Sequence, residues 1–149
     1  MRTLAIDLGT RRVGLALSDE GGRLATPYEV VQVTSPEMAA AKIREVIEKE
    51  GVTRIVLGLP LNMDDSIGPA ARQAVAWGND LARRAERPVL YVDERLSSFA
   101  AQQDLNDRKR GGEKLTRKRR KEQLDALAAA GFLQAFLDGK LQAIDVSYL

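Results

Sequence analysis

The chain contains no cysteine and no histidine. Without cysteine it can form neither disulfides nor thiolate zinc sites, and without histidine it lacks the commonest general base and the commonest metal ligand. Any metal ion must therefore be held by oxygen atoms. Carboxylate, carbonyl and water ligands suit Mg²⁺ or Mn²⁺, which pair naturally with phosphate chemistry. These two absences thus favour Mg²⁺ or Mn²⁺ as the cofactor of any metal site.

Long uncharged apolar runs and an N-terminal export signal are also missing. We therefore expect neither a membrane span nor secretion, and we interpret the protein as cytoplasmic. The apolar share of 44% and the charged share of 30% are typical of a globular protein. The 149 residues suffice for one stable core but leave no room for a second domain, so we expect a single domain over residues 1–149.

Apolar patterns and turn residues predict an alternation of strands and helices. Three strands at 3–8, 13–18 and 24–33, joined by short turns, predict an antiparallel meander. The later elements are a helix at 36–50, a strand at 54–59, a helix from Pro69 with a stripe of small residues, a strand at 88–92, a helix from Ser97 or Ser98 to Leu105, and a last helix at about 116–137. This βββαβαβαα order implies parallel pairings and a mixed five-stranded sheet with helices on both faces, an α/β fold.

Asp7 is the single charge of an apolar strand and falls just before a glycine turn. Burying a lone carboxylate is costly unless a hydrogen-bonded partner, a raised pKa or a bound cation compensates. A turn-capping role is the simplest alternative. Asp93 and Glu94 also follow a strand, and Asp125 interrupts an apolar helical stretch, where Lys121 one turn earlier is an alternative partner. The constellation of carboxylates favours a cation site over a cap.

A basic segment stands out late in the chain. Residues 107–121 hold nine Lys or Arg and two acidic residues, a net charge of +7 in a chain whose net charge is +2. Part of this charge opens the last expected helix, where the helix dipole and mutual repulsion disfavour it, so bound phosphates explain it better than a solvated face does. Few aromatics accompany the segment, which favours contacts to backbone charge or shape over base stacking. The candidate nucleic-acid contacts are Arg108, Lys109, Arg110, Arg117, Lys118, Arg119 and Arg120.

Four motifs, in their order and spacing, closely resemble the YqgF/RuvX family over essentially the whole chain. They are Ala5-Ile6-Asp7-Leu8-Gly9-Thr10-Arg11-Arg12-Val13-Gly14-Leu15-Ala16, Gly58-Leu59-Pro60-Leu61-Asn62, Asp93-Glu94-Arg95-Leu96-Ser97-Ser98 and Asp125-Ala126-Leu127-Ala128-Ala129. An Asp-x-Gly-Thr motif alone also marks sugar kinases and actin-like ATPases, whereas four motifs in register are specific. The family is described as Holliday junction resolvases and, in some bacteria, pre-16S rRNA nucleases, with an RNase H-like fold. The resemblance implies a metal-dependent endonuclease acting on branched DNA, precursor rRNA or both.

The resemblance also implies which residues form the site. Such nucleases hold divalent metal ions between acidic side chains, and Asp7, Glu94 and Asp125 fit as the metal ligands and catalytic residues. Because adjacent residues of a strand point to opposite faces, only one of Asp93 and Glu94 should face the metal, and Asp93 stays a second candidate.

The residues around this acidic set have less specific roles. Asp64 and Asp65 could supply an outer ligand, but a solvated loop is the simpler interpretation. Arg11, Arg12 and Arg95 are the expected phosphate contacts beside the metal.

Two other classes of function compete with a nuclease. An actin-like ATPase would bind nucleotide phosphates at the turn after Asp7, but it needs a second similar domain for which the chain has no room. A non-catalytic nucleic-acid-binding module would keep the basic residues and would not need the three carboxylates. We therefore favour the nuclease.

Paired incisions across a DNA junction require two active sites related by a two-fold axis. The resemblance therefore leads us to expect a weak homodimer that becomes effective on junction DNA. Trp77 and residues 144–149 are the apolar candidates for its interface. Either could instead pack on its own domain, and for Trp77 packing against a loop is the favoured interpretation.

Overall fold

The computed structural model describes residues 1–95 and 117–149. For residues 117–123 it describes the backbone but not the side chains. Its elements are β1 (Thr3–Leu8), β2 (Arg12–Ser18), β3 (Ala25–Gln32), α1 (Pro36–Glu50), β4 (Arg54–Leu59), α2 (Pro69–Ala85), β5 (Val89–Asp93) and α4 (Arg117–Leu137). Each was predicted from the sequence with nearly the same bounds. The helix expected between Ser97 or Ser98 and Leu105 lies outside the described residues.

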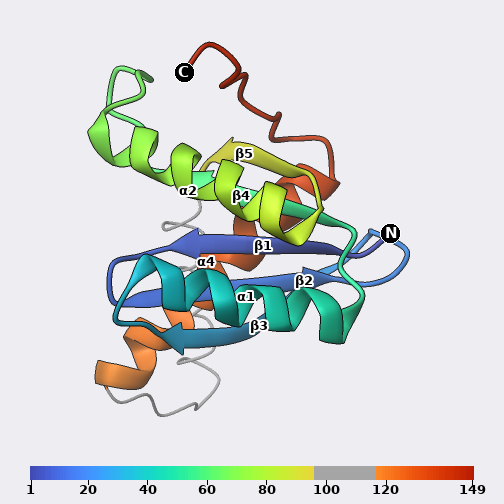
Figure 1. Ribbon diagram of the computed structural model, residues 1–149. Coiled ribbons are helices and arrows are strands. Elements are labelled where there is room, and N and C mark those ends of the chain that lie inside the picture. The colour runs from blue at the N-terminus through green and yellow to red at the C-terminus, as the bar shows by residue number, and fades with distance from the viewer. Residues whose placement is uncertain (96–116) are drawn as a thin grey trace.

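The strands form one mixed sheet in the order β3-β2-β1-β4-β5 (Figure 1). The antiparallel meander of β1, β2 and β3 is confirmed, and β4 pairs in parallel with both β1 and β5. The two strands that α1 connects, β3 and β4, are not paired with each other as the element order predicts. Instead, β4 lies beside β1. The physical reason is burial: residues 55–59 are all buried and need neighbours on both sides, whereas β3 is largely exposed and suits an edge.

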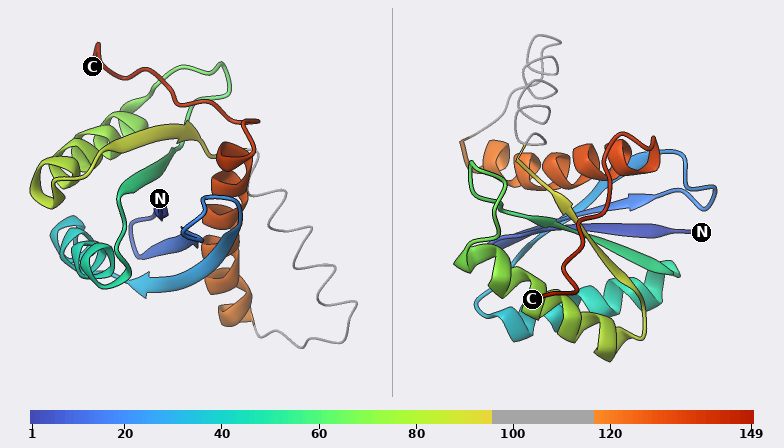
Figure 2. Two further views of the ribbon diagram at one scale, coloured as in Figure 1. Left: turned by 90° about the vertical axis from the view of Figure 1, so that its right-hand side faces the viewer. Right: turned by 90° about the horizontal axis from the view of Figure 1, so that it is seen from above.

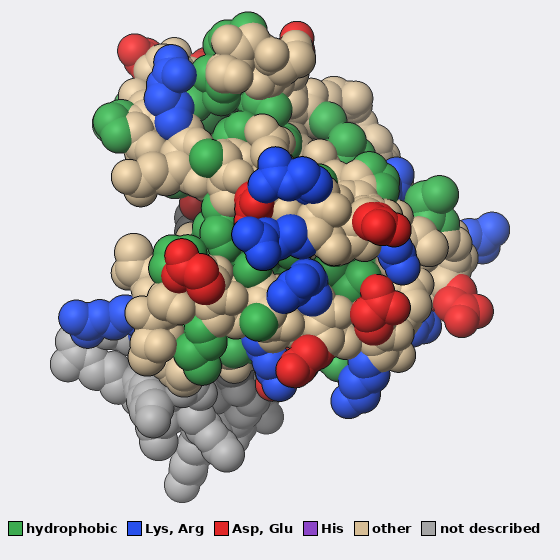
Figure 3. Space-filling view, viewed as in Figure 1, with side chains coloured by type: hydrophobic (Ala, Val, Ile, Leu, Met, Phe, Trp, Pro, Cys, Tyr) green, Lys and Arg blue, Asp and Glu red, His purple; other side chains and the backbone are tan. Residues whose placement is uncertain are grey.

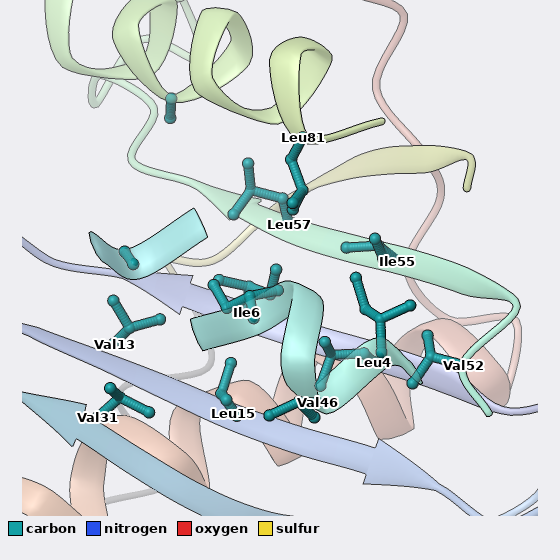
Figure 4. Packing of buried hydrophobic residues seen from close by; sticks show 14 of the residues in the cluster. Leu4, Ile6, Val13, Leu15, Val31, Val46, Val52, Ile55, Leu57 and Leu81 are labelled. Atoms are coloured by element: carbon teal, nitrogen blue, oxygen red, sulfur yellow. The ribbon is translucent and has the colours of Figure 1, made fainter. Parts of the chain in front are cut away.

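Helices cover both faces of the sheet, as predicted. Figure 2 shows α1 and α2 on one face and α4 on the other. The first face carries large branched side chains, which form the main core together with α1 and α2 (Figure 4). The second carries small residues such as Ala5 and Ala16, which pack against Phe132 and Leu133 of α4. The small residues let α4 lie close to the sheet.

The helix ends follow the local sequence. The hydroxyl of Ser35 accepts a hydrogen bond from the backbone N–H of Met38 at 3.0 Å, and Pro36 opens α1. Gly51 ends α1 with a φ of 65°, a conformation that favours glycine. Within the parts of the chain that the structure describes, no helix is long and apolar enough to cross a membrane.

Candidate active site

Asp7 and Glu94 lie side by side at the edge of the sheet where β1, β4 and β5 end. Alternation along the strands explains this: Ala5 and Val92, two residues before each, pack under α4, so Asp7 and Glu94 face the same side. The carboxyl group of Glu94 and the carboxylate of Asp7 share a hydrogen bond. The structure thus brings together two of the three predicted catalytic residues.

Burial dominates the electrostatics of this pair. The pKa of Asp7 is raised to about 6, mainly by burial; the hydrogen bond from Glu94 opposes this rise and the charge of Asp125 adds to it. Burial and then the charge of Asp7 raise the pKa of Glu94 to about 8. At neutral pH the two carboxyl groups therefore share one proton, because two carboxylates buried this close together cannot both be ionised.

A glycine makes room for Glu94. A Cβ at Gly58 of β4 would lie 2.8 Å from Oε2 of Glu94 and 2.9 Å from a ring carbon of Phe132. No side chain fits there, so Gly58 lets the carboxyl of Glu94 and α4 both reach the sheet. The motif that contains Gly58 predicts no separate role for it, although a glycine inside a buried strand is itself a signal of close approach.

Asp125, the third predicted ligand, reaches the site from α4. Its Oδ2 accepts a hydrogen bond from Nε of Arg12 at 2.7 Å, within an ion pair that is about one-third exposed. The alternative partner, Lys121, has a side chain outside the description. Among the described side chains, no group of three or more acidic residues is arranged to hold a metal ion. Asp125 is thus near Asp7, but Arg12 holds it.

Arg11 and Arg12, both expected as phosphate contacts, line the same small pocket as two of the carboxylates. This charged pocket has a volume of about 250 Å³. Its lining residues are Asp7, Gly9, Thr10, Arg11, Arg12 and Asp125. Acidic and basic side chains therefore meet at the end of β1, the arrangement expected where a phosphate is brought to carboxylates.

Asp93 lies apart from this pocket. Its carboxylate accepts hydrogen bonds from the backbone N–H of Arg95 at 3.0 Å and from Nε of Arg95 at 2.9 Å, and these bonds hold the pKa of Asp93 below its ordinary value. The guanidinium of Arg95 also donates to the backbone oxygen of Asn62 at 2.7 Å and pairs with Asp65. Arg95 thus fastens the loop after β4 to the end of β5, and Asp93 and Asp65 lie with it.

The structure describes the remaining candidates to different extents. Asp64 is exposed and accepts a hydrogen bond from the backbone N–H of Ser66 at 3.1 Å, as a solvated loop residue does. The backbone of Arg117, Lys118, Arg119 and Arg120 opens α4, but their side chains lie outside the description. Arg108, Lys109 and Arg110 lie outside the described residues altogether. Their phosphate-binding role stays a prediction.

Both candidate dimer segments contact their own domain. The indole N–H of Trp77 donates to the backbone oxygen of Pro36 at 3.1 Å, so Trp77 packs on its own domain, against the start of α1 and the main core instead of the expected loop. The backbone N–H of Ile144 donates to the oxygen of Tyr91 at 2.7 Å, and Ile144 and Val146 pack on the main core. Tyr148, 70% exposed, is the largest apolar surface left by this segment.

Comparison with solved structures identifies the fold. RuvC of Thermus thermophilus, in a complex with a Holliday junction substrate, is similar with a TM-score of 0.59 over 97% of this chain and 99% of the other, at 19% identity. A second RuvC structure from that organism gives the same score. The RNase H-like architecture expected from the sequence is thereby confirmed.

Comparison with sequences identifies the family. The model of the family described as "RuvX: Holliday junction resolvase" matches residues 1–139. A protein of Acidiphilium cryptum named "Putative pre-16S rRNA nuclease" is 43% identical over 92% of this chain and 84% of its own length. One of the same name from Maridesulfovibrio salexigens is 42% identical over 92% of this chain and 98% of its own. The chain therefore belongs to the RuvX Holliday junction resolvase family, a family of nucleases.

Proposed function

We propose that the protein is a divalent-metal-dependent endonuclease that cleaves phosphodiester bonds in structured nucleic acid. The observation that carries the proposal is the buried pair of Asp7 and Glu94, with Asp125 and two arginines beside it in one pocket. A buried pair of like-charged groups destabilises the fold unless something compensates. A bound cation is the compensation that also serves phosphodiester cleavage.

The donor set fits Mg²⁺ or Mn²⁺, because every candidate ligand is a carboxylate oxygen. Asp7, Glu94 and Asp125 would hold the metal, and Asp93 would not, since it lies outside the charged pocket and is bonded to Arg95 there. Metal ions bound there supply activation of a water molecule and charge stabilisation at the leaving oxygen.

The chain's own residues prepare the site in three ways. Gly14 and Gly58 let α4 and Glu94 approach the sheet closely. Arg12 donates a charge-assisted hydrogen bond to Asp125, which holds that carboxylate in position beside Asp7. Arg11 is exposed at the rim of the charged pocket, where a guanidinium can meet an incoming phosphate.

We propose precursor 16S rRNA as the first substrate to test. The support is the name shared by relatives of about 40% identity that match over 92% of this chain. A four-way DNA junction is the second candidate, supported by the description of the matching family. Both are structured polyanions, so phosphate contacts from the basic segment suit either. Such substrates would place the enzyme's work in the cytoplasm.

The deciding experiment measures cleavage of precursor 16S rRNA fragments and of synthetic four-way junctions in parallel. Each is incubated with Mg²⁺, Mn²⁺ or EDTA, and the Asp7→Asn variant is the control against a contaminating nuclease. We expect metal-dependent cleavage of at least one substrate by the wild type and almost none by the variant. Cleavage that persists in EDTA, or equally in the variant, contradicts the proposal.

A further inference from the structure

A second pocket lies across the same turn from the charged one. It has a volume of about 520 Å³ and opens between the N-terminal ends of α1 and α2, on the face of the sheet away from α4. Figure 3 shows the molecule hollowed on its left side between these helices, with hydrophobic side chains on the walls. Gly9 and Thr10 line both pockets, so the turn after β1 is their common wall. We call this second space the Trp77 pocket.

None of the described side chains that line the Trp77 pocket is charged, in contrast to its neighbour. Trp77, Pro36, Pro60 and Leu8 give it broad apolar surfaces. The indole N–H of Trp77 is bonded to the backbone of Pro36 at 3.1 Å, which fixes the ring and leaves its π-surface as the group it can offer a ligand. An uncharged, flat ligand suits such walls better than an ion or a flexible chain.

Polar groups at the same pocket match the edge of a heterocycle. Gln73 of α2 is exposed and offers both an amide donor and an acceptor, and Thr10 and Thr34 offer hydroxyls. Amide and hydroxyl groups are those that pair with the edges of bases. The charged pocket thus suits the phosphate of a nucleotide, and the neighbouring Trp77 pocket suits its base.

We propose that the Trp77 pocket binds an unstacked nucleobase of the substrate next to the phosphate held in the charged pocket. This inference rests on the proposed nuclease function and adds a second subsite to it. Stacking on an aromatic side chain tolerates any base, so the pocket would favour unpaired or branched strands without imposing a sequence. It would thereby help the enzyme to distinguish structured substrates from an uninterrupted duplex.

Trp77 makes the test direct, because it is the single tryptophan of the chain. Its fluorescence is followed in EDTA while a substrate that the enzyme cleaves is added. A series of otherwise identical substrates carries one abasic site at successive positions. We expect quenching by the intact substrate and its loss when the abasic site falls at one position beside the cleaved bond. Equal quenching by every member of the series, or by none, overturns the proposal.

Two exposed alanines of α2 provide matched variants. Ala70 lines the Trp77 pocket and Ala76 does not. Ala70→Leu should fill the mouth of the pocket and weaken binding of the intact substrate about 5- to 10-fold, at the lower end of what stacking of one base supplies. It should not change binding of the critical abasic substrate, and Ala76→Leu should change neither. Equal effects of the two leucines contradict a base subsite.

Other results separate this inference from its alternatives. If free nucleosides quench the fluorescence of Trp77 at lower concentrations than the substrate does, the pocket is a site for free nucleotides and our assignment is overturned. An unresponsive Trp77 in an enzyme that cleaves would leave the nuclease function standing, reject the base subsite and favour an apolar protein partner. A protein that cleaves neither class of nucleic acid would overturn the proposed function and this inference with it.

Discussion

Gly14 of β2 and the backbone oxygen of Asp125 are so close that a Cβ on Gly14 would lie 2.1 Å from that oxygen. Gly14 is also the register partner of Asp7 across the antiparallel pair. One glycine therefore sets both how near α4 lies to the sheet and how near the carboxylate of Asp125 lies to that of Asp7. The active site depends on a residue that has no side chain.

Gly14→Ala should damage both stability and activity, because α4 must move to admit the methyl group. We expect a loss of about 1–3 kcal/mol in the free energy of unfolding, as for other overpacked sites, and cleavage reduced roughly 10²-fold because Asp125 is displaced. Urea unfolding and single-turnover cleavage measure the two. Gly21→Ala is the control, since its nearest neighbour would be 3.7 Å away. Similar behaviour of the two variants would contradict this role for Gly14.

Asp7→Asn, Glu94→Gln and Asp125→Asn should each lower the cleavage rate by on the order of 10³-fold, the scale expected when one member of a catalytic set is lost. Their effects should not add, because the three act as one unit. Asp7→Asn and Glu94→Gln should fold as well as the wild type or better, since repulsion between carboxylates is reduced, whereas in Asp125→Asn the lost ion pair with Arg12 offsets that gain.

Asp93→Asn serves as the matched neighbour in that series. Its carboxylate is tied to Arg95, so we expect most of the activity to remain. Near-normal turnover of Glu94→Gln combined with an inactive Asp93→Asn would exchange the roles of the two residues.

The stability of the metal-free protein should depend on pH through the Asp7 and Glu94 pair. Their ordinary pKa values are 3.8 and 4.5, and folding raises them to about 6 and about 8. A raised acid pKa contributes stability that is complete below the ordinary value and is lost as pH rises through the folded value. Thermal unfolding in EDTA should therefore show a falling Tm from about pH 5 to pH 9.

The Glu94→Gln variant tests the origin of that slope. Glutamine removes the charge that the buried pair must accommodate, so Tm should fall much less over the same pH range and exceed that of the wild type at its upper end. An unchanged slope in the variant would assign the pH dependence to other groups.

Neutralising Arg117, Arg119 and Arg120 together by glutamine should weaken binding of nucleic acid and flatten its dependence on salt. Each lost phosphate contact should remove about 0.7–0.9 from the slope of log K against log salt concentration. Sequence preference should hardly change, since such contacts do not read bases. Neutralising the exposed Arg44, Arg83 and Arg84 of α1 and α2 is the control of equal charge. Equal slopes in the two triple variants would mean that Arg117, Arg119 and Arg120 are exposed to solvent and do not contact phosphates.

Symmetry should distinguish the two substrates. A resolvase needs two active sites related by a two-fold axis, so we expect a weak homodimer on a four-way junction, while trimming of an RNA can be done by a monomer. Sedimentation with and without a junction, combined with mapping of the incisions, measures this. One subunit per junction with unpaired nicks would exclude the resolvase and favour RNA processing.

The sequence by itself determined the elements, the mixed sheet and the carboxylates of the site. These features are local: they are the strand and helix periods, the caps of α1 and the positions of acidic residues at strand ends. Local features can be predicted from a short stretch of sequence. They were sufficient to indicate Asp7, the neighbours Asp93 and Glu94, and Asp125 as candidates, and the family resemblance then implied Glu94 over Asp93. The absence of histidine and cysteine restricted their chemistry to oxygen ligands.

Only the tertiary structure decided which neighbours those residues have. It placed β4 beside β1, assigned Asp93 and Glu94 to opposite faces, paired Arg12 with Asp125 across more than a hundred residues, and gave Arg95 an internal role. It also showed Gly14 and Gly58 as the points where α4 and Glu94 reach the sheet. These relationships depend on packing between distant segments, and packing is fixed by shape and burial in three dimensions, which no local pattern records.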